Sequence, residues 1–493
     1  MISTLKLQNT NLSFFPNSLT THDEVEYGLA KIGSEQQLAV LADPGSNILK
    51  DFSGVYTDHE ELTLVLCPLT ARHANSLRCH LPWLKPRPLG LATSAGLGDR
   101  LGVATPGHVR AVRAVGGNIA PIFAQQSMRE MARTGRTPQI VMDNATWGTF
   151  QEGWKNGVGA DADHLKTPAD IDICLAAGFT FFTIDPGDHV DNRSETTDQN
   201  LVAKLAETLP AEVQPGATGL AGQTYKIEDL VIEFDEATLL KASVKYGRAV
   251  SHVASMYRHL VKAAGSKPFE LEVSVDETEH PTSHAEHLYI ASQLKRLGVQ
   301  WISLAPRYIG RFEKGVDYIG DLAEFENNLA GHAAIAREYG PYKLSLHSGS
   351  DKFSIYPAAM RQTQGLVHLK TAGTSYLEAL RTIAEVDVDL FKEIYIFARE
   401  HYETDRVSYH VSADLSRAPL PEDVVEWPGL LDEFDAREIF HVTFGTVLTW
   451  QESKDKKLFY DRFFSVLKSK PDLYADNLQK HFIRHLKPFR SME

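Results

Sequence analysis

The chain has 493 residues and a mass of 54.8 kDa, and 43% of its residues are hydrophobic while 23% are charged. This composition is ordinary for a soluble globular protein, so it excludes a disordered or fibrous class, and the length allows one or two large cores. The 50 Lys and Arg residues against 64 Asp and Glu residues give a net charge of −14. That balance argues against nucleic acid as the main partner, whereas a small anionic substrate needs only one or two local cations.

Membrane and secretion signals are missing from the sequence. No run approaches the roughly 20 apolar residues of a membrane span, and residues 1–16 lack the basic and apolar regions of a secretion signal. The three cysteines, Cys67, Cys79 and Cys174, form no CxxC pair, which fits a reducing compartment. We therefore predict a cytoplasmic protein with a small-molecule partner and no nucleic-acid or membrane partner, which could assemble as a homo-oligomer.

Residues 1–87 are expected to form a smaller α/β unit at the amino end of the chain. Residues 37–41 and 62–67 are apolar and strand-like, and residues 23–33 are expected to be helical. A proline-rich piece at 82–88 is a natural boundary, because proline interrupts regular structure.

Beyond this boundary, short apolar runs alternate with longer amphipathic stretches. The strand candidates are 89–93, 120–124, 158–163, 180–185, 269–275, 300–304, 343–347 and 365–370. The helix candidates between them are 105–115, 127–134, 167–177, 283–297 and 325–339. Thr105 and Thr167 each precede a proline, as N-cap residues do. Eight strands alternating with helices predict a (β/α)₈ TIM-type barrel within 88–400, with a doubly wound sheet as the second choice.

Two further regions complete the predicted organisation. The stretch at about 192–249, between the fourth and fifth strand candidates, is expected to be an insertion in the barrel. Residues 401–493 are expected to be a mainly helical region that packs on the barrel, with one strand-like run at 407–411.

Polar clusters fall where the strand candidates end, which is the end of a barrel where active sites are built. Asp161 and Asp163 share one strand face, and His164 follows directly. On the strand candidate at 269–275, Glu270, Glu272, Ser274 and Asp276 lie on one face and apolar residues on the other. We expect the acidic face to point into the barrel, where the carboxylates would repel one another unless a cation or raised pKa values intervene.

A third cluster follows the strand candidate at 343–347. Lys343, Ser345 and His347 share a face, and the Ser-Gly-Ser turn after His347 offers backbone amides for an anionic oxygen. Histidine nitrogens and carboxylate oxygens together suit a divalent metal ion such as Mn²⁺, Co²⁺, Ni²⁺ or Zn²⁺. The residues alone leave the metal and its full ligand set open.

A glycine-rich loop, TSAGLGDR at 93–100, follows the first strand candidate. Its spacing matches a dinucleotide loop only loosely, and the acidic residue expected about twenty positions later is missing. We favour a loop that lets the backbone approach a substrate, with Arg100 available for a carboxylate. Further candidate cations are Lys166, Arg307, Lys352 and Lys370.

Several strings resemble the tagaturonate epimerase family. They are TSAGLGDR at 93–100, FAQQS at 123–127, GADADHLKT at 159–167, FTIDPGDH at 182–189 and HSGSDK at 347–352. The resemblance covers residues 88–445 and implies a metal-dependent enzyme of hexuronate catabolism that interconverts D-tagaturonate and D-fructuronate. On this basis the predicted substrate-binding residues are Arg100, Gln126, Lys166, Asp185, Arg307, Ser350, Asp351 and Lys352.

Three runs of the chain are also similar to those of class II aldolases, which are metal-dependent barrels. These runs are Asp163-His164, Glu270-Leu-Glu272 through Glu279, and His347-Ser-Gly-Ser350. This similarity implies that Asp163 is an acid/base and that His164, Glu272 and His347 belong to a metal site. The sixth strand departs from the aldolase pattern, because Pro306 and Arg307 stand where those enzymes have another ligating histidine. His368 and His410 are candidate substitutes for that ligand.

The interconverted stereocentre lies β to the ketone, so its C–H bond is not acidified and retro-aldol cleavage is the better chemistry. A metal would act as the Lewis acid, and Asp163 or Glu279 would take the proton of the β-hydroxyl. The predicted catalytic carboxylates are therefore Asp163, Glu279 and Glu270. The alternatives are a nicotinamide-assisted epimerase, a metal-dependent aldolase that releases its fragments, and a non-catalytic sugar-acid binding protein.

Overall fold

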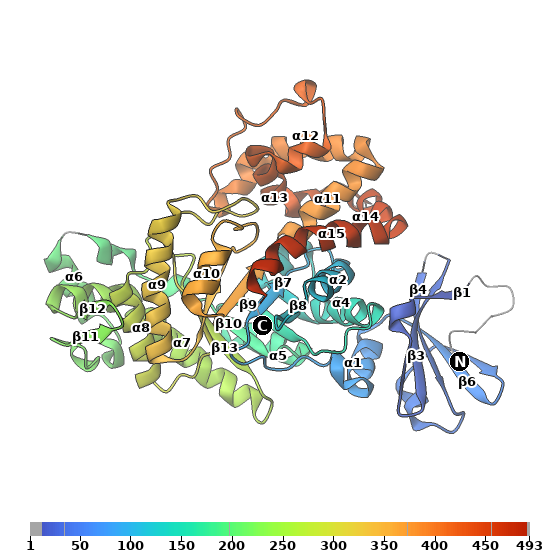
Figure 1. Cartoon of the computed structure of the whole chain (residues 1–493), viewed down its shortest axis with the longest axis horizontal. Helices are drawn as coiled ribbons and strands as arrows, with labels where there is room; N and C mark the ends of the chain where they lie inside the picture. The colour runs from blue at the N-terminus through green and yellow to red at the C-terminus, as the bar shows by residue number, and fades with distance from the viewer. Residues whose placement is uncertain (1–11, 34, 197, 372, 455, 491–493) are drawn as a thin grey trace.

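The computed structural model describes residues 12–33, 35–196, 198–371, 373–454 and 456–490. An antiparallel sheet, a closed barrel and a group of helices follow one another along the chain (Figure 1). The expected (β/α)₈ barrel with an amino-terminal extension and a helical carboxyl-terminal region is confirmed. The limits that we predicted for these parts stay predictions.

The amino-terminal part is an antiparallel sheet with one helix. The sheet contains β1 (Leu12–Phe14), β2 (Thr20–His22), β3 (Val25–Ile32), β4 (Glu35–Ala42), β5 (Val55–His59) and β6 (Leu62–Pro68), and α1 (Ala71–His80) follows it. The strands expected at 37–41 and 62–67 are confirmed. The helix expected at 23–33 is wrong, because Val25, Tyr27 and Leu29 alternate with period two and enter one core cluster as part of β3.

The barrel consists of eight parallel strands. They are β7 (Ser94–Leu97), β8 (Ala120–Ser127), β9 (Gly159–Leu165), β10 (Phe181–Ile184), β13 (Glu270–Ser274), β14 (Ser303–Ala305), β15 (Lys343–Leu346) and β16 (Val367–Thr371). Pairing of β16 with β7 closes the barrel. The first strand begins after the expected 89–93, because the amides of Leu89 and Gly90 bind the Glu270 carboxylate.

Helices cover the outside of the barrel. They are α2 (Thr105–Val115), α3 (Met128–Thr134), α4 (Pro138–Gln151), α5 (Pro168–Ala177), α7 (Glu236–Ala264), α8 (His284–Arg296), α9 (Leu322–Tyr339), α10 (Tyr356–Thr363) and α11 (Thr374–Val386). Thr167 caps α5 as expected, through a reciprocal capping box with Asp170. Thr105 is instead the first helical residue of α2, and Ala104 occupies the N-cap.

An additional segment separates β10 from α7, where we expected an insertion. It contains α6 (Gln199–Glu207) and a hairpin of β11 (Thr224–Ile227) and β12 (Leu230–Glu233), and it lies at one side of the barrel (Figure 1). Asp235 then caps α7, a helix of 29 residues.

The carboxyl-terminal helices gather on one side of the barrel (Figure 1). They are α12 (Val388–Asp405), α13 (Phe434–Thr449), α14 (Tyr460–Ser469) and α15 (Pro471–Leu486), with a small hairpin of β17 (Gln451–Ser453) and β18 (Lys456–Lys457). Helix α15 packs along α2 and α11, which joins the end of the chain to the barrel. The strand expected at 407–411 is wrong, because a 3-10 turn at Arg406–Ser408 leads into irregular chain.

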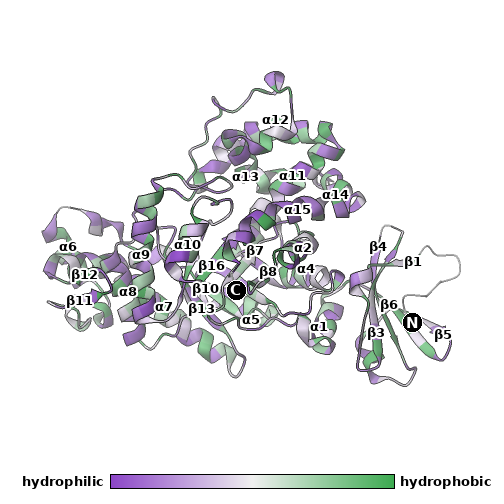
Figure 2. Ribbon diagram, in the orientation of Figure 1, coloured by the Kyte–Doolittle hydropathy of each residue, from purple (hydrophilic) through white to green (hydrophobic). Residues whose placement is uncertain are grey.

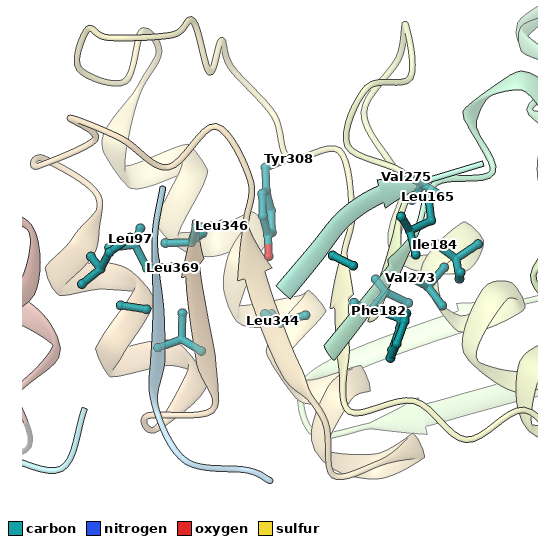
Figure 3. Close-up of a cluster of buried hydrophobic side chains, with 14 of the residues drawn as sticks. Leu97, Leu165, Phe182, Ile184, Val273, Val275, Tyr308, Leu344, Leu346 and Leu369 are labelled. Carbon is teal, nitrogen blue, oxygen red and sulfur yellow. The ribbon is translucent and has the colours of Figure 1, made fainter. Parts of the chain in front are cut away.

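The barrel strands are apolar outside and polar inside. The outward residues, such as Phe182, Val273, Leu344 and Leu369, pack in one core cluster (Figure 3), against helices that carry both hydrophobic and hydrophilic residues (Figure 2). Most barrels of this type fill the interior with branched apolar side chains. Here the fully buried interior residues include Asp161, Thr183, Glu272, Lys343, Ser345 and His368.

None of the helices in the described ranges combines the length and the apolar character that crossing a membrane requires.

Replacing Phe182 by Ala should lower the free energy of unfolding by about 3–5 kcal/mol, because its fully buried ring would leave a cavity between strand and helices. Urea unfolding measures the loss. Ile173→Ala is the matched control, since Ile173 is 47% exposed on the neighbouring helix α5 and should change stability by less than about 0.5 kcal/mol. Equal effects of the two substitutions would contradict this packing.

Candidate active site

The carboxyl ends of the barrel strands surround a cavity of about 330 Å³ that continues into a smaller one of about 30 Å³. The residues that line both are Arg129, Lys314, His347 and Ser348. Asp276, Glu277, Glu279, Arg307, Tyr409 and His410 line only the larger cavity, and Gln125, Glu130, Asp163, His164, Ser350 and Lys370 line only the smaller one. The candidate active site therefore lies at the end of the barrel where the polar clusters were expected.

A larger hollow of about 860 Å³ lies elsewhere, between the amino-terminal sheet, α4 and α14. The residues described as lining it include no histidine. Chemistry is therefore better supported at the barrel end.

His347 follows β15 and lies between two carboxylates. Its Nε2 is 2.6 Å from Glu272 Oε1, and its Nδ1 is 3.2 Å from Asp276 Oδ1. Burial by itself lowers the pKa of His347, but the charges of Asp276 and Glu272 raise it to about 9. Both ring nitrogens are thus directed by acidic side chains of the same strand, β13, and its continuation.

His164 lies opposite His347, with ring centres 5.1 Å apart. Its Nδ1 is 3.1 Å from Asp185 Oδ2, which leaves Nε2 facing the cavity side, 3.8 Å from Asp163 Oδ1. Burial opposes protonation, yet Asp163 and Asp185 together raise the pKa of His164 to about 10. The residue has a left-handed backbone with φ of 53°, which is uncommon for a residue other than glycine.

Lys370 of β16 lies beneath the two histidines and joins three carboxylates. Its Nζ is 2.8 Å from each of Asp161 Oδ2, Asp163 Oδ1 and Glu272 Oε1. Burial by itself raises the pKa of Asp163, but the charge of Lys370 lowers it below its ordinary value. This carboxyl group is therefore ionised. Three carboxylates and one ammonium leave a surplus of two negative charges, which two imidazolium rings or one divalent cation can balance.

These residues fit a divalent metal ion. Asp163, His164 and His347 each offer a ligand atom, and these atoms lie within 4.8 Å of one another. Glu272 is fully buried, and its Oε2 has no hydrogen-bond partner among the described residues. Nitrogen and carboxylate donors with a surplus of negative charge suit divalent ions such as Mn²⁺, Co²⁺, Ni²⁺ and Zn²⁺. Asp185 then orients His164 from behind, as carboxylates do for ligating histidines.

A second group of potential ligands, Asp351, His481 and His485, is already bonded within the protein. Arg437 lies 3.1 Å from Asp351 Oδ2, and the amide of Asp351 donates to His485 Nε2 at 2.8 Å. This group ties α15 to the turn after β15.

The structure brings together only some of the residues predicted from sequence. Asp163, His164, Glu272 and His347 form one cluster, and Arg307, Glu279 and Ser350 line the two cavities. The candidate substitute His410 lines the larger cavity, whereas His368 is buried inside the barrel, where its Nδ1 lies 2.9 Å from Ser94 Oγ.

The other predicted residues bond elsewhere in the protein. Glu270 accepts from the amides of Leu89 and Gly90 at the amino end of β13. Lys166 pairs with Asp188 outside the cavities, and Gln126 donates to Glu130. Lys352 donates its ammonium protons to the carbonyls of Glu313, Val316 and Ser350, and Asp351 belongs to the α15 group.

Arg100 is fully buried between the barrel and α13. It pairs with Glu130, its guanidinium lies 3.7 Å above the Phe444 ring, and it contacts His441. Burial by itself raises the pKa of Glu130, but the charge of Arg100 keeps this pKa below its ordinary value. Arg100 thus joins the carboxyl-terminal helices to the barrel.

The glycine-rich loop before α2 folds around an acidic side chain. Asp99 accepts hydrogen bonds from the amides of Leu101, Gly102 and Ala104 at 2.7–2.9 Å. These three amides are therefore engaged within the loop and do not face a pyrophosphate.

Sequence reasoning missed several cavity residues. Gln125 donates to Asp163 Oδ2 at 3.1 Å, and the alternation along β8 identifies it, rather than Gln126, as the inward residue. Asp276 was placed on the acidic inward face by the sequence pattern, but it was given no role at the site. Lys314 and Tyr409 lie on irregular segments, where no periodic signal marks them.

Comparison with known proteins places these observations in context. The family described as tagaturonate epimerase matches residues 15–489. A tagaturonate/fructuronate epimerase of Thermotoga maritima is 47% identical over 429 residues, which cover 87% of each chain. The native crystal structure of fructuronate-tagaturonate epimerase UxaE from Cohnella laeviribosi is 37% identical, covers 97% of this chain and 96% of that one, and has a TM-score of 0.91. A glycerol complex of the same enzyme is 36% identical, with the same coverages and TM-score.

Replacing Arg100 by Met should lower the free energy of unfolding by about 3–5 kcal/mol, because Glu130 would stay buried without its cation. Urea unfolding measures this loss. The double variant R100M/E130Q should recover part of it, since the uncompensated charge is then removed. A fully stable R100M variant with a raised KM would instead support the assignment of Arg100 to the substrate.

Proposed function

The chain belongs to the tagaturonate epimerase family, and from this premise we propose that it interconverts D-tagaturonate and D-fructuronate by metal-supported retro-aldol and aldol steps. The observation that carries the proposal is the cluster of Asp163, His164, Glu272 and His347 beside a cavity that is lined by cationic side chains. Acid/base carboxylates, histidine donors and a binding site for an acidic sugar are thus combined at one end of the barrel.

The position of the stereocentre determines the chemistry. Its carbon lies β to the ketone, so breaking the bond between it and the carbon beside the ketone yields an aldehyde and an enediolate. The β-hydroxyl loses its proton as that bond breaks, and the same proton returns when the bond re-forms on the other face of the aldehyde. A divalent ion held by His164, Glu272 and His347 would supply Lewis-acid stabilisation of the negative charge on the ketone oxygen.

Asp163 is the base that we assign to the β-hydroxyl. Lys370 donates to its Oδ1 at 2.8 Å and Gln125 to its Oδ2 at 3.1 Å, so the carboxylate is fixed in orientation. Its lowered pKa keeps it ionised, and it can accept a proton without first losing one. Glu279 lines the larger cavity and is the second candidate for this role.

Arg307 and Lys314 are the cations that we assign to the substrate carboxylate. Of the other lining cations, Arg129 pairs with Glu277 at 2.7 Å, and Arg311 lies 3.5 Å from Glu313. Within the described ranges, neither Arg307 nor Lys314 has a side-chain hydrogen bond or ion pair, although burial lowers the pKa of Arg307. A substrate carboxylate could accept hydrogen bonds from both side chains and would balance one of the two positive charges.

Arg307 and Lys314, which we call the carboxylate anchor, also account for epimerisation rather than release of fragments. After cleavage the carboxylate remains on the aldehyde fragment, which turns about the single bond next to its carbonyl. A carboxylate held by Arg307 and Lys314 keeps the fragment in the cavity while its aldehyde presents the other face.

Two substitutions should separate metal binding from proton transfer. His347→Ala should lose bound metal, because an imidazole donor is removed, whereas Asp163→Asn should retain metal and lose about 10²–10⁴-fold in kcat. Elemental analysis of the purified proteins and nuclear magnetic resonance of the sugar mixture measure the two properties. The reverse pattern would exchange the two roles. Full activity after metal removal, or the near-ultraviolet absorption of a bound reduced nicotinamide, would contradict the proposed mechanism.

Substituting the anchor should weaken binding and release fragments. Arg307→Met or Lys314→Met should raise KM about tenfold to hundredfold, since a charge-assisted hydrogen bond contributes about 1.5–3 kcal/mol. Trapping with a hydrazine reagent should detect free aldehyde in these variants. Lys166→Met is the matched control, because Lys166 pairs with Asp188 outside the cavities. An unchanged KM in both anchor variants would place the substrate carboxylate elsewhere.

A further inference from the structure

Two buried carboxyl groups from distant parts of the chain help to hold the segment 409–414 beside the candidate site, and the half-buried Asp435 accepts from the amide of Asp414 at 2.8 Å. Tyr409 and His410 of this segment line the larger cavity. Glu313 Oε2 accepts from the Ser412 amide at 2.7 Å and from the Ser412 hydroxyl at 2.8 Å. Glu438 Oε2, from α13, accepts from the next amide, that of Ala413, at 3.0 Å. The amides of Ser412 and Ala413, which are consecutive in an irregular segment, are thus held by the two buried acids.

The two acids also face each other. Glu313 and Glu438 are 4% and 0% exposed, and their side chains lie within hydrogen-bond reach. Glu438 Oε1 has no hydrogen-bond partner in the described part of the chain. Two buried, ionised carboxylates within hydrogen-bond reach repel each other. A single proton shared between them removes one of the charges and supplies the missing hydrogen bond.

The surroundings favour the protonated pair. Lys352 and the Tyr402 hydroxyl are the other titratable groups that face Glu438 from neighbouring elements. The Lys352 ammonium is engaged with three backbone carbonyls, and Arg311 reaches only Glu313, at 3.5 Å, from an exposed position. Burial and the Glu313 charge raise the pKa of Glu438 to about 8.

We propose that Glu313 and Glu438 are positioning residues that share one proton and thereby hold the segment 409–414, with Tyr409 and His410, against the substrate cavity. Glu313 lines the larger cavity and Glu438 does not, and both acids accept hydrogen bonds from backbone amides of the segment. The proposal rests on the proposed function only in naming the cavity as the substrate site, because the hydrogen bonds that carry it exist without substrate.

The direction of the pH effect follows from proton linkage. In the closed segment Glu438 keeps its proton up to a pH of about 8, whereas water reaching Glu438 in an opened segment would return its pKa toward the ordinary 4.5. Opening therefore releases a proton. The equilibrium constant for opening rises by up to about tenfold per pH unit between these two pKa values. Above the higher value the opening constant becomes independent of pH.

Hydrogen–deuterium exchange of the full chain, read on peptides that cover 409–414, tests the proposal. Exchange rates corrected for the intrinsic pH dependence should rise with pH from 5 to 8 in the wild type. In Glu438→Gln the slope should vanish while protection remains, because an amide donates to Glu313 and accepts from Ala413 as the protonated acid does. Glu313→Gln should behave alike and provides a second test where the first variant does not fold. Glu393→Gln is the matched control and should keep the wild-type slope, because Glu393 is exposed on α12 and pairs with Arg462 rather than with a residue that contacts the segment.

The outcomes are separable from those of the proposed function. Equal slopes in the wild type and in both glutamine variants would overturn the shared proton, as would loss of protection at every pH in both variants. The KM of the wild type should rise with pH relative to that of Glu438→Gln, while kcat at saturating substrate should change little, since closure precedes the chemical step. Because exchange is measured without substrate, it does not depend on which sugar acid is turned over.

Discussion

A buried ammonium inside the barrel is the constraint on which the rest of the structure depends. Lys370 is 4% exposed, and burying such a charge costs several kcal/mol unless partners surround it. Its partners, Asp161, Asp163 and Glu272, come from β9 and β13, so the ammonium joins three strands. A slip of one residue in any of these strands would move a charge into the apolar layer outside. The network therefore requires one register as strongly as the hydrophobic core does.

The two faces of the barrel strands serve different purposes. The outward residues, including Val273 and Leu344, pack against helices and supply the hydrophobic stabilisation. The inward residues contribute little apolar burial, and they collect a surplus of negative charge beneath His164 and His347. Because the outer layer stabilises the fold, the interior can retain charges that repel one another in the absence of a cation. That surplus is what makes the end of the barrel suitable for a metal ion and for proton transfer.

The sequence predicted best what depends on local periodicity. Alternation along β9, β13 and β15 placed Asp163, Glu272 and His347 on inward faces, because side-chain direction in a strand is fixed by position alone. The partner of a long side chain depends on tertiary contacts, so Arg100 and Lys352 were assigned to the substrate although they bond within the protein. Lys314 was missed for the converse reason, because an irregular segment brings it to the cavity without a pattern.

Substrate binding and chemistry are thus built from different kinds of structure. Asp163, His164 and Glu272, which would transfer the proton and hold the metal, stand on strands whose backbone is fixed by pairing with neighbouring strands, and His347 directly follows β15. The cations and aromatic groups at the mouth stand on the 306–320 and 409–414 segments, which Lys352, Glu313 and Glu438 hold through backbone contacts. Retro-aldol chemistry needs both properties, because the reacting carbons must meet rigid acid/base groups while one fragment turns. Because a few hydrogen bonds hold the segments 306–320 and 409–414, these segments can admit and retain that fragment without disturbing the barrel strands.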